Sequence, residues 1–248
     1  MRKWDLFFEL YESLPRQGPG DNASTRKAFE MIRGLSRRPR ILDIGCGNGM
    51  QTLELARISG GTVLALDNHQ PFLDRLKRDA RSAGMGKSIR TVRRSMKAMG
   101  FRDGSFDIVW SEGALYQMGF LRGLKRCRRL LKPGGWLAVT EAVRFRNRFP
   151  AEVRRFWRDE YPDITTVEAN LRKIRTAGFT PAGHFPLPVR AWIAPFYAPM
   201  EITVRRLVRK YREDARAQAL LETWLAEIDI YRRYSDFFGY EFFIMHRE

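Results

Sequence analysis

The stretch Ile41-Leu-Asp-Ile-Gly-Cys-Gly-Asn-Gly49 decides the fold class, because it joins a short apolar strand to glycines at alternate positions. Such glycines let the chain turn sharply and bring bare backbone close to a ligand. Helical spacing of apolar residues begins at Met50. Asp67 closes the next apolar run, where a second parallel strand would end and a carboxylate could accept both hydroxyls of a ribose. These residues predict a nucleotide-type pocket.

The spacing of the glycines indicates which ligand the pocket takes. A dinucleotide fingerprint reads G-x-G-x-x-G and holds pyrophosphate at a helix N-terminus. Here the pattern is G-x-G-x-G, position 50 is Met, and Asp43 precedes the first glycine. A carboxylate there would repel pyrophosphate and suit a ligand with a free ammonium group. Residues 43–49 together with Asp67 resemble the cofactor loop of class I S-adenosylmethionine-dependent methyltransferases. A strand-to-helix turn without a ligand is the disfavoured alternative.

The resemblance implies which residues surround S-adenosylmethionine. Those expected around its methionine and ribose parts are Asp43, Gly45, Cys46 and Gly47. Asp67 would hold the ribose hydroxyls, and Asn68 would lie beside the adenine. Ser95 and Met96 follow the third strand and resemble the position where the family presents a side chain and an amide to the adenine edge. An ordinary loop is the alternative for these two residues.

The turn after the fourth strand, Ser111-Glu-Gly-Ala-Leu-Tyr-Gln-Met, is expected to border both cofactor and substrate. It lacks the N-P-P-Y or D-P-P-Y signature of amino-methylating nucleic-acid enzymes. Glu112 could orient a substrate, act as a base, contact the methionine ammonium or be merely structural, and Tyr116 is expected at the substrate. Alignment beside an already activated methyl group supplies much of the rate of such reactions, so a weak catalytic signal is expected.

Apolar runs alternate with helical patterns, which predicts parallel strands with helices on both faces of an open sheet. The expected strands are 40–44, 62–67, 89–93, 106–110, 134–142, 179–187 and 240–246, the last one antiparallel. The expected helices among them are 48–59, 70–83 and 119–131. Lys132-Pro-Gly-Gly135 resembles the turn before the fifth strand of class I methyltransferases. The predicted fold is therefore a Rossmann-like seven-stranded sheet.

Outside this core the chain has two further parts, and all of it is expected to form one structural domain. Residues 1–35 predict a helical cap, residues 36–187 and 239–248 the core, and residues 188–238 an insertion that acts as a lid. The cap should contain helices at 4–14 and 24–35, and the insertion an aromatic loop followed by a long helical stretch. Thr165 and Glu168 predict a capping box that opens a helix ending at Gly178.

The predicted cap and lid supply candidate substrate residues. Arg16 and Gln17 could touch the cofactor or an anionic substrate. Trp192 and Tyr197 could form an apolar or cation-binding wall, with plain packing of the insertion as the alternative. The stretch 111–120, together with Arg16-Gln-Gly-Pro-Gly20 and Glu160-Tyr-Pro, resembles a largely uncharacterised bacterial subgroup of the ubiquinone- and menaquinone-methylase-like small-molecule methyltransferases. That resemblance names no acceptor.

The amino-acid composition indicates the class of protein and its expected location. A hydrophobic content of 44% and a charged content of 29% in 248 residues are those of a soluble globular protein. No apolar run approaches the roughly 20 residues that span a bilayer, and the apolar stretch at 6–8 is too short for a secretory signal. Cys46 and Cys127 make no disulfide framework, so a cytoplasmic location is expected. The scattered histidines and cysteines predict no metal site.

The formal net charge of +17 invites a nucleic-acid hypothesis, but the basic residues are spread along the chain. Their densest cluster, at 125–132, is interpreted as the solvated face of a helix. The leading hypothesis is a methyltransferase that acts on a small molecule in an enclosed pocket. The alternatives are an RNA methyltransferase and a cofactor-binding module without catalysis. The protein is expected to be a monomer or a homodimer.

Overall fold

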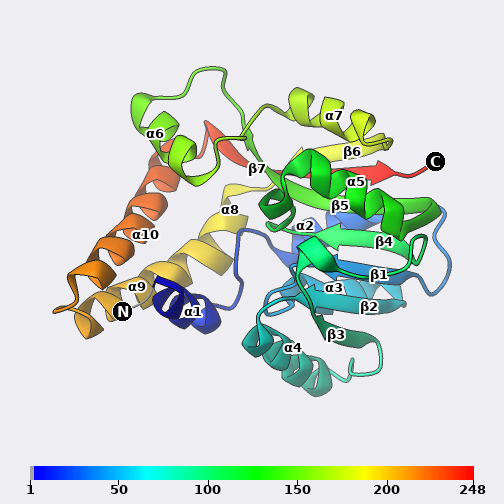
Figure 1. Ribbon diagram of the computed structural model, residues 1–248, viewed down its shortest axis with the longest axis horizontal. Helices are drawn as coiled ribbons and strands as arrows, with labels where there is room; N and C mark the ends of the chain where they lie inside the picture. Colours follow the sequence, from blue (N-terminus) through cyan, green and yellow to red (C-terminus); the bar gives the residue numbers. More distant parts are fainter. Residues whose placement is uncertain (1–2) are drawn as a thin grey trace.

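A seven-stranded sheet with the order β3-β2-β1-β4-β5-β7-β6 forms the centre of the protein (Figure 1). The computed structural model describes residues 3–248. The strands are β1 Arg40–Ile44, β2 Thr62–Asp67, β3 Ile89–Arg93, β4 Phe106–Ser111, β5 Leu131–Arg144, β6 Thr180–Pro186 and β7 Phe238–His246. The pairs among β1 to β5 are parallel, and β7 runs antiparallel between β5 and β6. The predicted Rossmann-like fold class is confirmed.

The inner strands form because their apolar side chains find a buried environment on both faces of the sheet. In β1, the side chain of Ile41 joins the core on one face, and those of Leu42 and Ile44 join the core on the other. Side chains alternate along a strand, so Asp43 is directed to the same face as Ile41. This alternation sets the surroundings of Asp43.

Helices cover the two faces of the sheet (Figure 1). The helices on the face of Ile41 are α2 Asn22–Glu30, α3 Met50–Ser59 and α4 Gln70–Ser82, and those on the opposite face are α5 Phe120–Leu130 and α7 Val167–Thr176. In α5, the apolar residues Leu124 and Cys127 are buried, while the basic residues face outward. Cys46 and Cys127 are both buried free thiols.

A third group of helices lies beside the carboxyl ends of the parallel strands (Figure 1). These elements are α1 Lys3–Ser13, α6 Ala151–Glu160, α8 Val189–Trp192, the π-helical segment Ile193–Tyr197, α9 Ala198–Lys210 and α10 Ala215–Tyr234. Helix α1 packs against α9 and α10, and α10 also contacts α6. Segments far apart in the sequence thus meet at the edge of the sheet where ligands bind in such folds.

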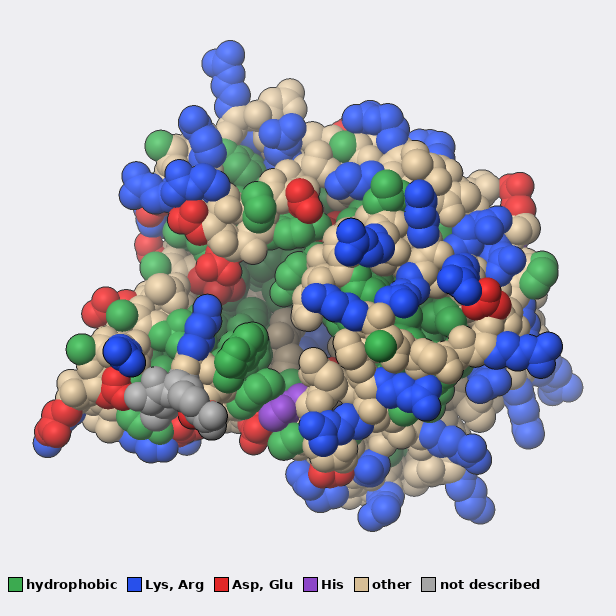
Figure 2. Space-filling model, viewed as in Figure 1, with side chains coloured by type: hydrophobic (Ala, Val, Ile, Leu, Met, Phe, Trp, Pro, Cys, Tyr) green, Lys and Arg blue, Asp and Glu red, His purple; other side chains and the backbone are tan. Residues whose placement is uncertain are grey.

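Basic and hydrophobic side chains are distributed differently over the surface. Figure 2 shows Lys and Arg side chains scattered over the sheet core, without one continuous basic stripe on that face. Hydrophobic side chains gather along the hollow between this core and the third group of helices. No helix in the described part of the chain is both long and apolar enough to cross a membrane.

Three local predictions are wrong. Thr166, not Thr165, caps α7, its hydroxyl accepting a bond from the amide of Ala169 at 3.2 Å. Thr165 is instead drawn to the sheet edge, where its carbonyl accepts a bond from Arg144. Helix α2 ends at Glu30, before the chain turns through Gly34. The long helical stretch of the insertion is interrupted where Asp214 caps α10 through the amides of two following residues.

Helix α6 is not among the helices that the sequence predicts. The predicted division into a cap at 1–35, a core and a lid at 188–238 stays a prediction, and Met1 and Arg2 lie outside the described residues.

Candidate active site

The glycine loop ties the end of β1 to the end of β2. The amides of Gly45 and Cys46 donate to the carbonyl of Leu66 at 2.8 and 3.0 Å. The amide of Gly47 donates to the Oδ2 atom of Asp67 at 3.0 Å. The loop therefore lies directly beside the carboxylate that was expected to hold a ribose.

Two glycines of the loop are required by both conformation and space. Gly45 has φ +72°, and a Cβ atom there would lie 2.4 Å from the Cβ of Ala114. Gly49 has φ +82°, and its Cβ would lie 2.3 Å from a methyl carbon of Leu76. Left-handed backbone disfavours other residues, and neither neighbour leaves room for a side chain. Only glycine at these two positions allows the loop to pack this closely against Ala114 and Leu76.

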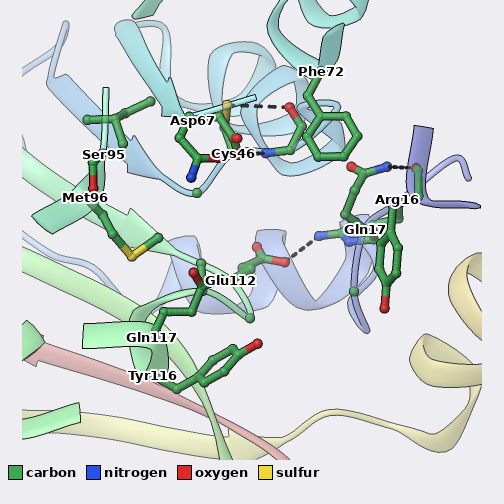
Figure 3. A pocket seen from close by; sticks show the side chains of 18 of the residues that line it. Arg16, Gln17, Cys46, Asp67, Phe72, Ser95, Met96, Glu112, Tyr116 and Gln117 are labelled. Atoms are coloured by element: carbon green, nitrogen blue, oxygen red, sulfur yellow. Dashed lines mark hydrogen bonds and ion pairs between the residues drawn. The ribbon is translucent and has the colours of Figure 1, made fainter. Parts of the chain in front are cut away.

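A cavity of about 520 Å³ opens beside this loop. Figure 3 shows Ser95 and Met96 on one side of it and Arg16 and Gln17 on the opposite side. The sequence-predicted residues that line it are Arg16, Gln17, Gly45, Cys46, Gly47, Asp67, Asn68, Ser95, Met96, Glu112 and Tyr116. One contiguous space thus brings together segments from the chain start to the turn after β4. Their binding roles stay predictions.

The carboxylate of Asp67 is oriented for a ligand. Its Oδ1 atom accepts a bond from the amide of His69 at 2.9 Å, and its Oδ2 atom accepts the bond from Gly47. Each carboxylate oxygen can accept a second hydrogen bond. Asp67 is therefore held at the cavity wall with acceptor capacity left for a pair of ribose hydroxyls, which fits S-adenosylmethionine.

Asp43 lies behind the loop rather than in the cavity wall. It is fully buried, and its Oδ2 atom accepts bonds from Thr52 at 2.5 Å and Gln51 at 3.2 Å, both on α3. Its Oδ1 atom has no hydrogen-bond partner among the described residues. Burial raises the pKa of Asp43 to about 7, and the nearby charge of Glu112 adds to the shift. The expected contact with the methionine ammonium stays a prediction.

Glu112 is engaged at both carboxylate oxygens. Oε1 accepts bonds from the hydroxyl of Thr25 at 2.8 Å and the indole of Trp110 at 2.9 Å, and Oε2 pairs with Arg16 (Figure 3). Arg16 and Glu112 are 5% and 9% exposed, so the pair is shielded from water. Glu112 therefore fastens the segment after α1 to the end of β4, which favours the structural alternative over a role as a base.

Gln17 fastens the same segment to the glycine loop. Its Oε1 atom accepts a bond from the amide of Asn48 at 2.7 Å, while its Nε2 atom donates to the carbonyl of Tyr11 at 3.1 Å. The chain between α1 and α2 is thereby held over the loop, and it forms one wall of the cavity.

The sequence and the fold of this chain are similar to those of known proteins. A model of the family described as "Methyltransferase domain" matches residues 42–139, from β1 to β5. The chain is 19% identical to a SAM-dependent methyltransferase from Geobacter sulfurreducens solved with S-adenosyl-L-homocysteine, with a TM-score of 0.83 over 98% of both chains. A SAM-dependent methyltransferase from Thiobacillus denitrificans gives the same TM-score at 20% identity, covering 100% of this chain and 99% of that one.

Residues 42–139 of this chain thus match a methyltransferase domain, and the chain as a whole shares the fold of the two solved proteins. The match agrees with the predicted class, and both solved proteins hold S-adenosyl-L-homocysteine, the product form of the predicted cofactor. Sterol 24-C-methyltransferase ERG6A of Gibberella zeae is 28% identical over 176 residues, which are 67% of this chain and 46% of that protein. The chain spans about half the length of the curated relatives it matches.

The protein has a second cavity, of about 170 Å³, next to the first. Tyr11, Gln17 and Tyr116 line both cavities, so the two share a wall. Trp192 and Tyr197, predicted to face a substrate, line this second cavity and not the first. The aromatic side chains around it are Tyr11, Tyr116, Phe156, Trp157, Tyr161, Trp192, Phe196, Tyr197, Phe238 and Tyr240.

Sequence reasoning missed several residues that line the two cavities. Phe8 of α1 and Phe72 of α4 line the first, and Phe8 also stacks on His69 with 3.7 Å between ring centroids. Glu227 of α10 lines the second. A signal existed for Glu227, because it interrupts the apolar side of its helix between Trp224 and Ile228. Nothing in the sequence signalled that α1 would reach α4.

Proposed function

We propose that the protein transfers a methyl group from S-adenosylmethionine to a small-molecule acceptor, by aligning the two in adjoining cavities. The observation that carries this proposal is the shared wall: the cavity beside the glycine loop adjoins an aromatic cavity through Tyr11, Gln17 and Tyr116. The sterol 24-C-methyltransferase to which the chain is similar is named for a small-molecule acceptor, which supports an acceptor of that size class.

In this proposal the protein contributes orientation and exclusion of water. S-adenosylmethionine, when bound, supplies a methyl group already activated on a sulfonium. The backbone of the glycine loop and the carboxylate of Asp67 would hold the cofactor. The Arg16–Glu112 pair and Gln17 keep the segment after α1 over the site. A nucleophile held in line with the methyl group in such a space needs little further catalysis.

The second cavity supports a small molecule over RNA as the acceptor. None of the described residues that line it is Lys or Arg, whereas Glu160 and Glu227 are present. A site for a phosphate backbone would instead need positive charge along its path. The scattered basic residues on the face in Figure 2 are consistent with a solvated surface.

Product formation tests the proposal directly. The protein is incubated with S-adenosylmethionine and, separately, with pools of small metabolites and with RNA, and S-adenosylhomocysteine is quantified. Release above background with a small-molecule pool is expected, and it should persist at high salt. Release with RNA alone, falling steeply with salt, would overturn the proposal in favour of an RNA methyltransferase. Cofactor binding without release in any pool would favour a binding module.

A further inference from the structure

The second cavity differs in charge from the rest of the protein. The chain has a formal net charge of +17, yet the described lining of this cavity contains no Lys or Arg. It does contain the carboxyl groups of Glu227, on α10, and Glu160, at the end of α6. A strongly basic protein therefore presents a locally acidic wall to whatever enters this space.

Glu227 has no basic partner of its own. The hydroxyl of Tyr197 donates to its Oε1 atom at 2.9 Å. No described Lys, Arg or His lies within ion-pair distance of its carboxylate, whereas Glu201 of α9 and Asp229 of α10 each pair with an arginine. Removing a carboxylate from water without a counter-charge is costly, so a ligand cation would relieve that cost.

Aromatic rings form the walls around this carboxylate. Trp192 packs edge to face on Tyr240, with 4.7 Å between ring centroids, and tilts against Tyr197 at 5.9 Å. Trp192 and Tyr197 are buried, so their rings are held in place before any ligand arrives. The face of an aromatic ring attracts a cation, and the attraction strengthens when water is excluded.

We propose that the second cavity binds a methyl acceptor with an amine on a small apolar body, its ammonium held by Glu227 against the rings of Trp192 and Tyr197. The inference rests on the proposed function and names the substrate class of the same site. A carboxylate or phosphate ester would meet the charges of Glu227 and Glu160 and is disfavoured.

The same placement gives Glu227 a proton-transfer role. The carboxylate takes one proton from the ammonium, which leaves a neutral amine with a free lone pair. That lone pair forms the new N–C bond to the methyl group while the C–S bond breaks, and its electrons remain on sulfur. The product is a protonated methylamine and a neutral thioether, so atoms and charge balance. Burial and the charge of Glu160 raise the pKa of Glu227 to about 7, which makes it a stronger base than an ordinary carboxylate.

Choline and its uncharged isostere 3,3-dimethylbutan-1-ol are suitable probes, because they differ in charge and hardly in shape. Each is titrated by calorimetry into the full-length protein saturated with S-adenosylhomocysteine. We expect choline to bind about tenfold more tightly, the factor that corresponds to ~1.4 kcal/mol. Equal binding of the two probes would overturn the proposal.

Substitution of the carboxylate localises the effect. Glu227→Gln keeps the shape and an acceptor for Tyr197, and it should reduce the preference for choline to about twofold or less. Glu222→Gln, at an exposed position of the same helix, is the matched control and should keep the full preference. A preference unchanged in Glu227→Gln would assign the cation to another site and overturn the proposal.

A pH series needs no variant. Choline itself does not titrate, so its affinity should be full above about pH 7 and fall as the pH drops through the pKa of Glu227. Glu160 of α6 and the phenols of Tyr11, Tyr116, Tyr197 and Tyr240 also face this carboxylate. An affinity independent of pH between 5 and 9 would contradict the assignment.

The binding of S-adenosylhomocysteine in the first step separates the two proposals. If S-adenosylhomocysteine does not bind, the proposed function fails, and choline selectivity is then measured on the protein alone. If it binds and choline shows no selectivity, only the amine assignment fails.

Discussion

The amide of Gly47 donates a hydrogen bond to the carboxylate of Asp67, with 3.0 Å between the nitrogen and Oδ2. This bond joins the two halves of the motif, because Gly47 belongs to the turn after β1 and Asp67 ends β2. It fixes the carboxylate at the wall of the larger cavity beside bare backbone. We expect cofactor binding to depend on this pairing.

Replacing Asp67 by Ala should weaken cofactor binding by about 1–3 kcal/mol, the scale for losing good hydrogen bonds to a charged group. Calorimetric titration of S-adenosylhomocysteine into wild type and variant measures the difference. Asp103→Ala is the control, since Asp103 forms an exposed pair with Arg129 away from the cavity. Unchanged affinity in Asp67→Ala would mean that the ribose does not lie at this carboxylate.

Gly45→Ala should destabilise the fold and abolish cofactor binding, because the new methyl group would collide with Ala114. Gly104→Ala separates collision from backbone strain. Gly104 has nearly the same φ, +65° against +72°, but nothing lies within 4 Å of its Cβ position. The control should lose about 1–2 kcal/mol from strain alone, and Gly45→Ala about 1–3 kcal/mol more. Urea unfolding checks both values; equal losses would show that the loop has room at position 45.

Glu112→Ala should lower the free energy of unfolding by about 3–5 kcal/mol, because Arg16 would stay buried without its carboxylate. Thr25→Val removes only the hydroxyl that bonds Oε1 and should cost about 1 kcal/mol. Urea denaturation of both variants gives the comparison. A loss in Glu112→Ala no larger than in Thr25→Val would contradict the anchoring role of this carboxylate.

Glu141 predicts a pH dependence of stability. Burial raises its pKa to about 8, although Tyr161 donates to its Oε1 atom at 2.6 Å. The folded state therefore keeps this proton at pH values where the unfolded chain, with a pKa near 4.5, has lost it. Folding is then favoured at low pH, and the contribution declines as pH rises from about 4.5 to about 8.

The variant Glu141→Gln keeps the acceptor for Tyr161 and cannot ionise. Relative to this variant, the wild type should lose a few kcal/mol of stability across that pH window and show no further change above it. Chemical denaturation of both proteins at several pH values measures the difference. A difference that stays constant from pH 4 to pH 9 would contradict the buried, protonated state of Glu141.

The strands of the sheet were predictable because each is a short apolar run bounded by turn residues. Strands β1, β2 and β3 lie at the predicted positions, since burial leaves an apolar run little choice of register. Helix boundaries were harder to predict, because the residues at helix ends can form hydrogen bonds to other elements instead. Thr165 was predicted to cap a helix, but its backbone bonds to Arg144 of β5 instead. Such competition between a cap and a sheet edge is invisible in one sequence.

The residues of the site also differ in how well the sequence predicts their positions. The glycine loop and Asp67 are local motifs, and their approach follows from the order of parallel strands. Asp43 belongs to the motif, yet strand alternation directs it toward α3 and away from the cavity wall. The pairing of Glu227 with Tyr197 joins two segments of the insertion that meet only in three dimensions. Contacts of that kind depend on helix packing, which residue spacing alone does not determine.

Calorimetric titration of S-adenosylhomocysteine into the wild-type protein tests the central claim most directly. The account predicts binding of one molecule per chain with a dissociation constant below about 1 mM, the upper end of ordinary substrate affinities. S-adenosylmethionine should occupy the same site and be displaced competitively. Absence of heat and of competition at millimolar concentrations of both compounds would contradict the account.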